Sequence, residues 1–279
     1  MGFQKALAHA GVLVLVCSSV FLQHSARAED TALNEGAQLA QDLFNPVADL
    51  YTIPFEMEFN RNIGPADEGE RLQLNIQPVI PISLNEDWNL ITRTILPVVS
   101  QKDIFPGAGR QSGIGDLSLS LFLSPQAPTK RGVTWGVGGV FLMPTASDEL
   151  LGTEKWSAGP TFLALGQRGP WIFGALTAHA WSYAGDSDRD DISATEIWPW
   201  FGYTWPTATT LYAMSDMGYD WKNEQWSIPV DVGISQLFEV GPIFVSADLG
   251  VGYWAQSPEY GAEEWRFRFQ VNLVLPKGR

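Results

Sequence analysis

The feature that most constrains this chain is a side-chain pattern of period two, which recurs in segments of about ten residues. In residues 50–60 (LYTIPFEMEFN), apolar side chains occupy every second position and mostly polar ones lie between them. Successive side chains of a β-strand point to opposite faces, so the pattern predicts a strand with one apolar face. It predicts twelve such strands, at residues 50–60, 72–77, 88–99, 117–123, 132–144, 156–166, 170–184, 192–204, 208–217, 225–237, 242–255 and 265–275.

The connections between these strands alternate in length. Short ones lie at 84–87, 125–131, 167–170, 205–207 and 239–241, whereas longer, acidic loops lie at 61–71, 100–113, 145–155, 185–191, 218–224 and 256–264. An even number of strands joined in this way is typical of a transmembrane antiparallel outer-membrane β-barrel. We therefore expect an all-β fold, a barrel of about 12 strands. A secreted β-sandwich is the alternative, but it leaves the alternation of loop length unexplained.

Residues 1–28 have the three parts of a secretory signal peptide. Lys5 supplies the positive charge, residues 11–22 are apolar, and Ala26-Arg27-Ala28 matches a cleavage site. We expect cleavage after Ala28 and location in the outer membrane of a Gram-negative bacterium. Cleavage removes Cys17, the single cysteine, so neither a disulfide nor a thiolate-bound metal is expected.

The rest of the chain divides into two parts. Residues 49–279 are predicted to form the barrel. Residues 29–48 are predicted to be an N-terminal periplasmic or plug segment, because residues 34–43 have helical composition. A frayed leader is the alternative for this segment.

Net charge limits the partners. The chain carries 17 Lys and Arg against 31 Asp and Glu, a net charge of -14. Nucleic acid is excluded as a partner, because its phosphates bind clustered Lys and Arg side chains. The expected partners are outer-membrane lipid and lipopolysaccharide, the barrel-assembly machinery and small hydrophobic solutes. No cofactor is expected.

The polar face of the strands carries charges that lipid would not accept, so we expect it to line a polar lumen. Closure of the barrel would bring the first strand beside the last, so Glu56 and Glu58 could pair with Arg266 and Arg268. Structural pairing at this seam and a constriction that selects solutes are the two interpretations. The predicted lumen and seam charges are Glu56, Glu58, Arg71, Arg93, Asp116, Asp231, Asp248, Arg266 and Arg268.

Aromatic residues gather near the predicted strand ends. Trp and Tyr favour the two membrane–water interfaces, so their positions predict aromatic girdles. The predicted girdle residues are Tyr51, Trp88, Trp156, Trp171, Trp181, Tyr183, Trp226, Tyr253 and Trp265.

Two candidate chemical sites have simpler explanations. A barrel hydrolase needs a hydroxyl beside a base, but Ser182 points away from the face that His179 shares with Trp181, so no enzyme is expected. Asp186, Asp188 and Asp190 resemble the start of a calcium loop that lacks the required Gly and Glu. They indicate a solvated acidic loop or, as the alternative, a weak divalent-cation site.

Several stretches are similar to a family of Gram-negative outer-membrane proteins, the MetA-pathway phenol-degradation transporters, whose members are often labelled neuromedin U. They are FNPVADLYTIPF (44–55), NIQPVIPISLNEDWNLITRTILPVV (75–99), SGIGDLSLSLFLSP (112–125), GVFLMPTASDELLGTEKWSAGPT (139–161), WSIPVDVGIS (226–235) and YWAQSP (253–258). The resemblance implies a passive channel or transporter for small hydrophobic or aromatic compounds. The alternative function is a structural or surface-interaction barrel with a filled lumen and no transport.

Overall fold

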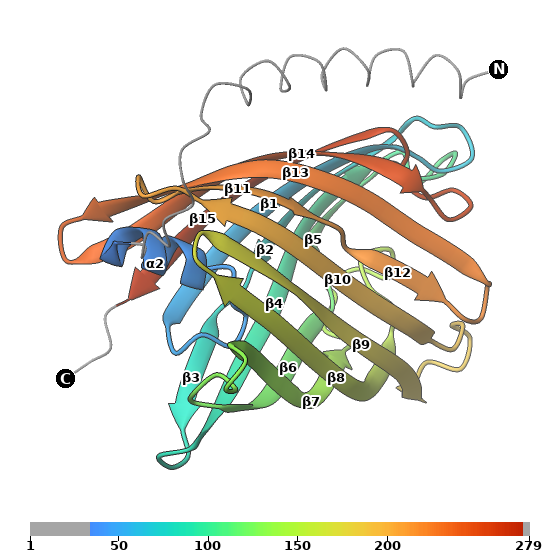
Figure 1. The fold of residues 1–279 in the computed structure, drawn as a ribbon. Helices are drawn as coiled ribbons and strands as arrows, with labels where there is room; N and C mark the ends of the chain where they lie inside the picture. Colours follow the sequence, from blue (N-terminus) through green and yellow to red (C-terminus); the bar gives the residue numbers. More distant parts are fainter. Residues whose placement is uncertain (1–33, 276–279) are drawn as a thin grey trace. The chain divides into compact units, whose positions relative to one another are not determined.

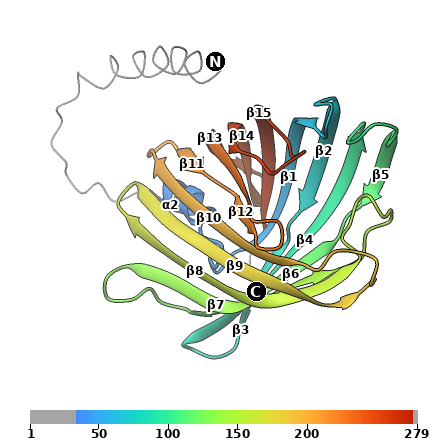
Figure 2. The same ribbon diagram turned by 90° about the vertical axis from the view of Figure 1, so that its right-hand side faces the viewer.

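The computed structural model describes residues 34–275, which form one closed antiparallel β-barrel preceded by a short helix (Figures 1 and 2). Each barrel strand pairs with its neighbours in the sequence, and the last pairs with the first, which closes the ring. The predicted barrel fold is therefore confirmed. The predicted signal peptide, residues 1–28, lies outside the described residues.

The elements are helix α2 (Glu35–Asp42) and strand segments β1 (Tyr51–Ile63), β2 (Gly69–Ile76), β3 (Val79–Ser83), β4 (Trp88–Lys102), β5 (Arg110–Ile114), β6 (Leu117–Pro125), β7 (Val133–Met143), β8 (Lys155–Arg168), β9 (Trp171–Gly185), β10 (Ser193–Thr204), β11 (Thr209–Met214), β12 (Met217–Asp220), β13 (Gln225–Val240), β14 (Ile243–Gln256) and β15 (Trp265–Leu275).

Fifteen strand segments make up twelve barrel strands, because three barrel strands are interrupted. β2 and β3 both pair with β1 and β4, β5 and β6 both pair with β4, and β11 and β12 both pair with β10 and β13. Pro78 separates β2 from β3, since proline has no backbone N–H to donate to the ladder. The strand number predicted from the sequence is confirmed.

Several strands extend further at the long-loop end than the side-chain pattern predicts. β1 continues to Ile63 and β4 to Lys102. At this end Glu70 lies opposite Lys102, and their charged groups are 3.1 Å apart. The backbone ladder needs no apolar side chains, so polar residues can prolong a strand beyond the apolar belt.

Large apolar side chains cover the outer surface of the barrel. Leu249 is 62% exposed and Phe267 is 53% exposed. An apolar belt of this extent is the surface that barrel strands present to lipid. Other exposed apolar side chains on the barrel strands are Met57, Leu72, Val137, Phe162, Phe173, Leu211, Val232, Ile234 and Phe269. Within residues 34–275, no helix is both long enough and apolar enough to cross a membrane.

The predicted girdle residues lie near both ends of the barrel strands. Tyr51, Trp88 and Trp171 begin β1, β4 and β9 at the short-turn end. Those at the long-loop end are Trp156, Trp181, Tyr183, Trp226, Tyr253 and Trp265. Ring contacts join five further aromatic residues to them, which were not among the predicted girdle residues: Trp135, Tyr203, Trp205, Tyr219 and Trp221. Contact of these rings with membrane interfaces stays a prediction.

Candidate functional site

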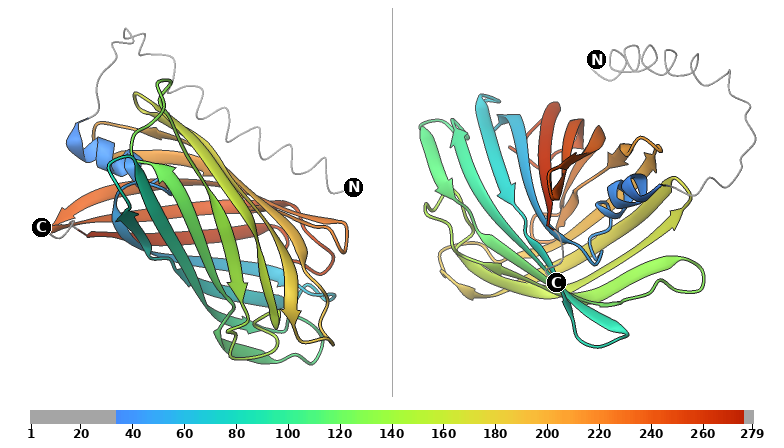
Figure 3. Two further views of the ribbon diagram at one scale, coloured as in Figure 1. Left: turned by 90° about the horizontal axis from the view of Figure 1, so that it is seen from below. Right: turned by 90° about the vertical axis from the view of Figure 1, so that its left-hand side faces the viewer.

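Helix α2 lies at the short-turn end of the barrel, against β10, β11 and β13 (Figures 1 and 3). Its N-cap residue, Asn34, accepts a hydrogen bond from the backbone N–H of Ala37 (2.8 Å) and donates one to the carbonyl of Pro206 (2.7 Å). Gln41, almost fully buried, donates to the carbonyl of Gly169 (3.1 Å). The helix is thus attached to the 169–170 and 205–208 turns.

After α2, the chain enters the barrel. The ring of Phe44 lies 5.4 Å from that of Tyr212, and Val47 is 5% exposed. Val47 belongs to an apolar cluster on the inner faces of β4, β6, β8, β9 and β10, which comprises Ile91, Phe122, Leu163, Leu165, Ile172, Leu176 and Trp200. The predicted polar lumen therefore has one apolar wall. Phe44 and Val47 pack against this apolar wall, so part of its surface is removed from contact with water in the lumen.

The opposite wall of the lumen carries a cluster of charges. Arg266 donates through Nε (2.8 Å) and Nη2 (2.7 Å) to the two carboxylate oxygens of Asp231, which is completely buried. Its Nη2 also lies 2.7 Å from a carboxylate oxygen of Asp216. A guanidinium that meets two carboxylates in this way is held rigidly, and its charge is compensated in the barrel interior.

Arg268 links the first and last strands within the same cluster. It donates to Glu56 on β1 and, through Nη1, to Asp216 (3.0 Å). Its Nε lies 3.8 Å from Glu58, which also lies 3.9 Å from Arg266. The predicted seam charges Glu56, Glu58, Arg266 and Arg268 therefore lie in one cluster. Asp231 belongs to the same cluster. Asp216 was missed, although it follows Thr210, Tyr212 and Met214 at the two-residue spacing of the inner face.

Three other predicted lumen charges have neutral partners. Arg93 donates to Gln77 (2.7 Å) and stacks over Trp198, with 4.7 Å from its Cζ to the ring. Arg71 donates to Gln101 (2.9 Å). Asp248 accepts hydrogen bonds from Ser246 (3.1 Å) and Asn272 (3.3 Å).

Asp116 was predicted to be a lumen charge, but its carboxylate binds a loop. It accepts hydrogen bonds from the N–H (2.6 Å) and hydroxyl (2.7 Å) of Thr153 and from the N–H of Ala146 (3.1 Å). Asp116 thus attaches the 144–154 loop at the interruption between β5 and β6. The barrel strand is broken there, so the carboxylate meets loop amides rather than the arginines of the lumen.

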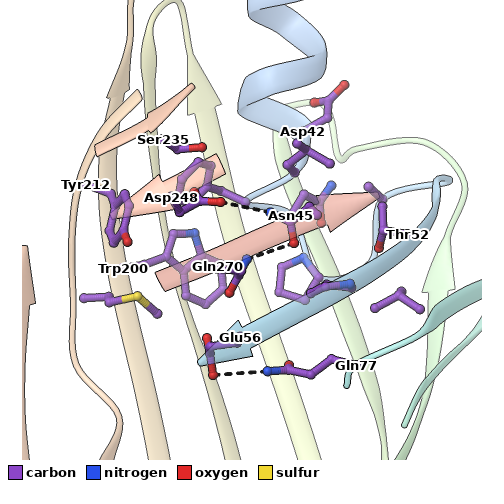
Figure 4. A pocket seen from close by; sticks show the side chains of 18 of the residues that line it. Asp42, Asn45, Thr52, Glu56, Gln77, Trp200, Tyr212, Ser235, Asp248 and Gln270 are labelled. Carbon is purple, nitrogen blue, oxygen red and sulfur yellow. Dashed lines mark hydrogen bonds between the residues drawn. The ribbon is translucent and has the colours of Figure 1, made fainter. Parts of the chain in front are cut away.

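A cavity of about 180 Å³ separates the two walls beneath the N-terminal segment (Figure 4). One side is apolar and aromatic, with Phe44, Leu176, Trp198, Trp200, Tyr212 and Met214. The other side is polar, with Glu56, Gln77, Arg93, Asp248, Arg268 and Gln270. An apolar cavity of about 150 Å³ is known to accept benzene, so this one has room for one aromatic ring.

The acidic loop after β9 shows no metal geometry. The carboxylate of Asp186 accepts the backbone N–H of Asp188 (2.8 Å), and residues 34–275 contain no group of three or more His, Cys, Asp or Glu placed to hold a metal ion. The hypothesis of a divalent-cation site at Asp186, Asp188 and Asp190 thus gains no support. In the same loop, a hydrogen bond from Lys155 (3.1 Å) lowers the pKa of Asp191.

His179 lies on the outer face of β9, where its ring is 4.0 Å from that of Trp181. Its Nδ1 is 2.7 Å from the hydroxyl oxygen of Thr195 on the neighbouring strand. The outward direction and the Trp181 neighbour agree with the sequence pattern, whereas the Thr195 partner depends on strand register.

Comparisons with known proteins identify the fold. No protein-family model and no curated protein matches the sequence. An outer membrane channel from Pseudomonas putida F1 has a similar structure, with a TM-score of 0.64, 14% identity, and coverage of 82% of this chain and 96% of that one. The NanC porin has a TM-score of 0.50 at 8% identity, with coverage of 80% and 99%. The chain therefore has the fold of outer-membrane β-barrels.

One comparison corrects the expectation that the chain is not an enzyme. The outer membrane phospholipase A of Salmonella typhi also resembles it, with a TM-score of 0.46, 14% identity, and coverage of 86% of this chain and 96% of that one. The expectation that the chain is not an enzyme, which rested on the positions of His179 and Ser182, is withdrawn.

Proposed function

We propose that this protein is an outer-membrane channel that passes small hydrophobic or aromatic solutes. The observation that carries the proposal is the two-walled lumen, in which an apolar and aromatic wall faces a charged one across a cavity of about 180 Å³. Porins for polar solutes have polar interiors, whereas an apolar wall offers an uncharged solute a favourable path. The fold shared with the Pseudomonas putida channel supports the proposal.

The proposed orientation follows from the two ends of the barrel. Outer-membrane barrels have short periplasmic turns and longer extracellular loops. The short turns and α2 would then face the periplasm, and the acidic loops would face outward, toward lipopolysaccharide. The signal peptide predicted at residues 1–28 supports export to this membrane.

The N-terminal segment is proposed to close the periplasmic mouth. Residues 34–48 contact the turns, the apolar wall and the cavity. Their removal should therefore widen the path through the lumen.

The test compares the mature chain with a variant that lacks residues 29–48. Both would be checked for heat-modifiable gel migration and then measured for bilayer conductance and for benzyl alcohol uptake by proteoliposomes. We expect uptake by the mature chain, and higher conductance and faster uptake for the variant. If folded protein of both forms neither conducts nor accelerates uptake, the transport proposal fails and the filled, structural barrel replaces it.

A further inference from the structure

We propose that the lumen cavity is a binding site for aromatic monocarboxylates, with the carboxylate on Arg93 and the ring against the Trp198–Trp200 side. This inference rests on the proposed channel function and deepens it by naming a class of solute. It depends on the unequal partners of the lumen arginines, on the aromatic wall and on the size of the cavity.

Arg93 differs from the other arginines that border the charge cluster. Arg266 and Arg268 each contact two or more carboxylates. Arg93 also lines the cavity, yet within residues 34–275 it forms no ion pair, and its one hydrogen bond goes to the neutral side chain of Gln77 (2.7 Å). A guanidinium has five N–H donors, so most of those on Arg93 remain for water or a solute.

The chemistry of the unused donors selects the polar end of the solute. A guanidinium presents two parallel N–H groups that match the two oxygens of a carboxylate, and such paired hydrogen bonds are the strong ones. The guanidinium of Arg93 lies over the Trp198 ring, with 4.7 Å from Cζ to the ring centroid, and donates to Gln77. These two contacts restrict its position before a solute arrives.

The wall next to Arg93 selects the apolar end. Trp200, Leu176 and Met214 line the same cavity as Trp198. Aromatic rings pack well against indole faces, and burial of a ring removes apolar surface from water. With about 180 Å³ available, the cavity fits one substituted benzene ring rather than a fused ring system or a long acyl chain.

Glu196 carries a negative charge whose effect on solute binding should be opposite to that of Arg93. It is the inward-facing residue that precedes Trp198 on β10, two positions away, and it does not line the cavity. Its charge would repel a carboxylate bound at Arg93 and would have little effect on an uncharged ring. Loss of the two charges should therefore change carboxylate affinity in opposite directions.

The experiment is isothermal titration calorimetry of the folded mature chain in detergent, with benzoate, benzyl alcohol and acetate as probes. We expect benzoate to bind more tightly than either of the others. Arg93→Gln should weaken benzoate binding at least tenfold and leave benzyl alcohol binding unchanged. Glu196→Gln should strengthen benzoate binding, and Arg71→Gln, a lumen arginine outside the cavity lining, should leave it unchanged.

Other results would overturn the proposal. Equal benzoate affinity in the mature chain and Arg93→Gln, or an equal loss for benzoate and benzyl alcohol, would mean that Arg93 does not recognise the carboxylate. If Arg93→Gln does not fold, Arg93→Lys replaces it. Lysine keeps the charge but loses the paired donors, so an intermediate affinity is expected and an unchanged affinity contradicts the proposal.

Failure of this inference can be told apart from failure of the channel proposal. Calorimetry measures binding without transport. A barrel that passes benzyl alcohol but has no Arg93-dependent benzoate affinity keeps the channel and loses the site. A barrel that binds benzoate through Arg93 but passes no solute keeps the site and loses the channel.

Discussion

Arg268 on β15 donates a hydrogen bond to Glu56 on β1, although the two residues stand 212 positions apart in the chain. Strand register places Arg268 directly opposite Glu58, yet the nearest atoms of that pair are 3.8 Å apart. The guanidinium instead reaches diagonally to Glu56 and also donates to Asp216, which lies between β11 and β12. Barrel closure is therefore accompanied by an ionic contact between the first and last strands.

Substitution of Arg268 should destabilise the barrel. Arg268→Ala leaves Glu56 and Asp216 without this guanidinium in a confined lumen, and loss of one partner of a buried pair costs about 3–5 kcal/mol. Arg61→Ala, which breaks the exposed pair with Glu264 (3.3 Å), is the control and should cost about 0–1 kcal/mol. The measurement is the urea midpoint followed by tryptophan fluorescence. Equal midpoints for the two variants would mean that the lumen screens Arg268 as bulk water does.

A charge exchange identifies the partner of Arg268. Because the hydrogen bond goes to Glu56, the exchange Glu56→Arg with Arg268→Glu should recover more stability than Glu58→Arg with Arg268→Glu. The recovery is the coupling energy of a double-mutant cycle, measured from urea midpoints. The order would be reversed if register alone, rather than the diagonal contact, set the pairing.

Leu249 tests which face of the barrel meets lipid. A lysine on the lipid face near the membrane midplane costs about 2–4 kcal/mol, so Leu249→Lys should lower stability by that amount in lipid vesicles. On a water-facing surface the same change would stay within about 0.5 kcal/mol. Tyr260→Lys, at an exposed site in the loop between β14 and β15, is the control and should be near neutral. Unfolding in vesicles provides the measurement, and a neutral Leu249→Lys would contradict lipid contact there.

Gly138 tests how closely β6 and β7 approach. A Cβ at this position would lie 1.7 Å from the backbone carbonyl oxygen of Leu121, which cannot move without distorting the strand. Gly138→Ala should therefore destabilise the barrel by about 1–3 kcal/mol or prevent folding. Gly218→Ala is the control, since its nearest neighbour would be 3.7 Å away. Heat-modifiable migration separates folded from unfolded protein, and a stable Gly138→Ala would refute the close approach.

Val47 tests the seating of the N-terminal segment. Val47→Asp would place a charge in the apolar cluster around Phe122 and Leu163, so the segment should leave the lumen and conductance should rise. Gln38→Ala, which changes an exposed hydrogen bond within the segment, should keep the conductance of the mature chain. Single-channel recording is the measurement. Unaltered conductance in Val47→Asp would show that residues 34–48 do not obstruct the path.

The pH dependence of stability tests the contact between Asp191 and Lys155 at the long-loop end. The Lys155 hydrogen bond holds the pKa of Asp191 below its usual range. A lowered folded-state pKa gives stability that is present at neutral pH and is lost as the pH falls through that pKa. The mature chain should therefore exceed Asp191→Asn in stability at pH 7, and the difference should shrink as the pH falls through the lowered pKa of Asp191. Asp190→Asn is the control, and a difference that persists in acid would contradict the ionic contact.

The side-chain pattern is enough to predict the barrel fold. The two-residue alternation and the unequal connections are local properties, and they are sufficient to predict twelve strands and an apolar outer face. The inward direction of Glu56 and Arg268 follows from the same parity, because each strand carries its own alternation. The interruption at Asp216 does not alter this parity, because β11 and β12 keep one register on β10, whereas the register on β4 shifts by one residue between β5 and β6.

The division of the lumen into an apolar and a charged wall depends on long-range contacts. In β8 and β9, both faces are apolar, so alternation cannot tell Leu163 and Leu176, which face inward, from Phe162 and Phe173, which face outward. The cover of residues 44–47 over this wall and the reach of Arg268 to Glu56 both depend on closure of the ring, as does the placement of Arg93, which forms no ion pair within residues 34–275. Closure joins residues far apart in the chain, 212 positions apart in the Arg268–Glu56 hydrogen bond, and no local pattern specifies which side chains then come within hydrogen-bond distance.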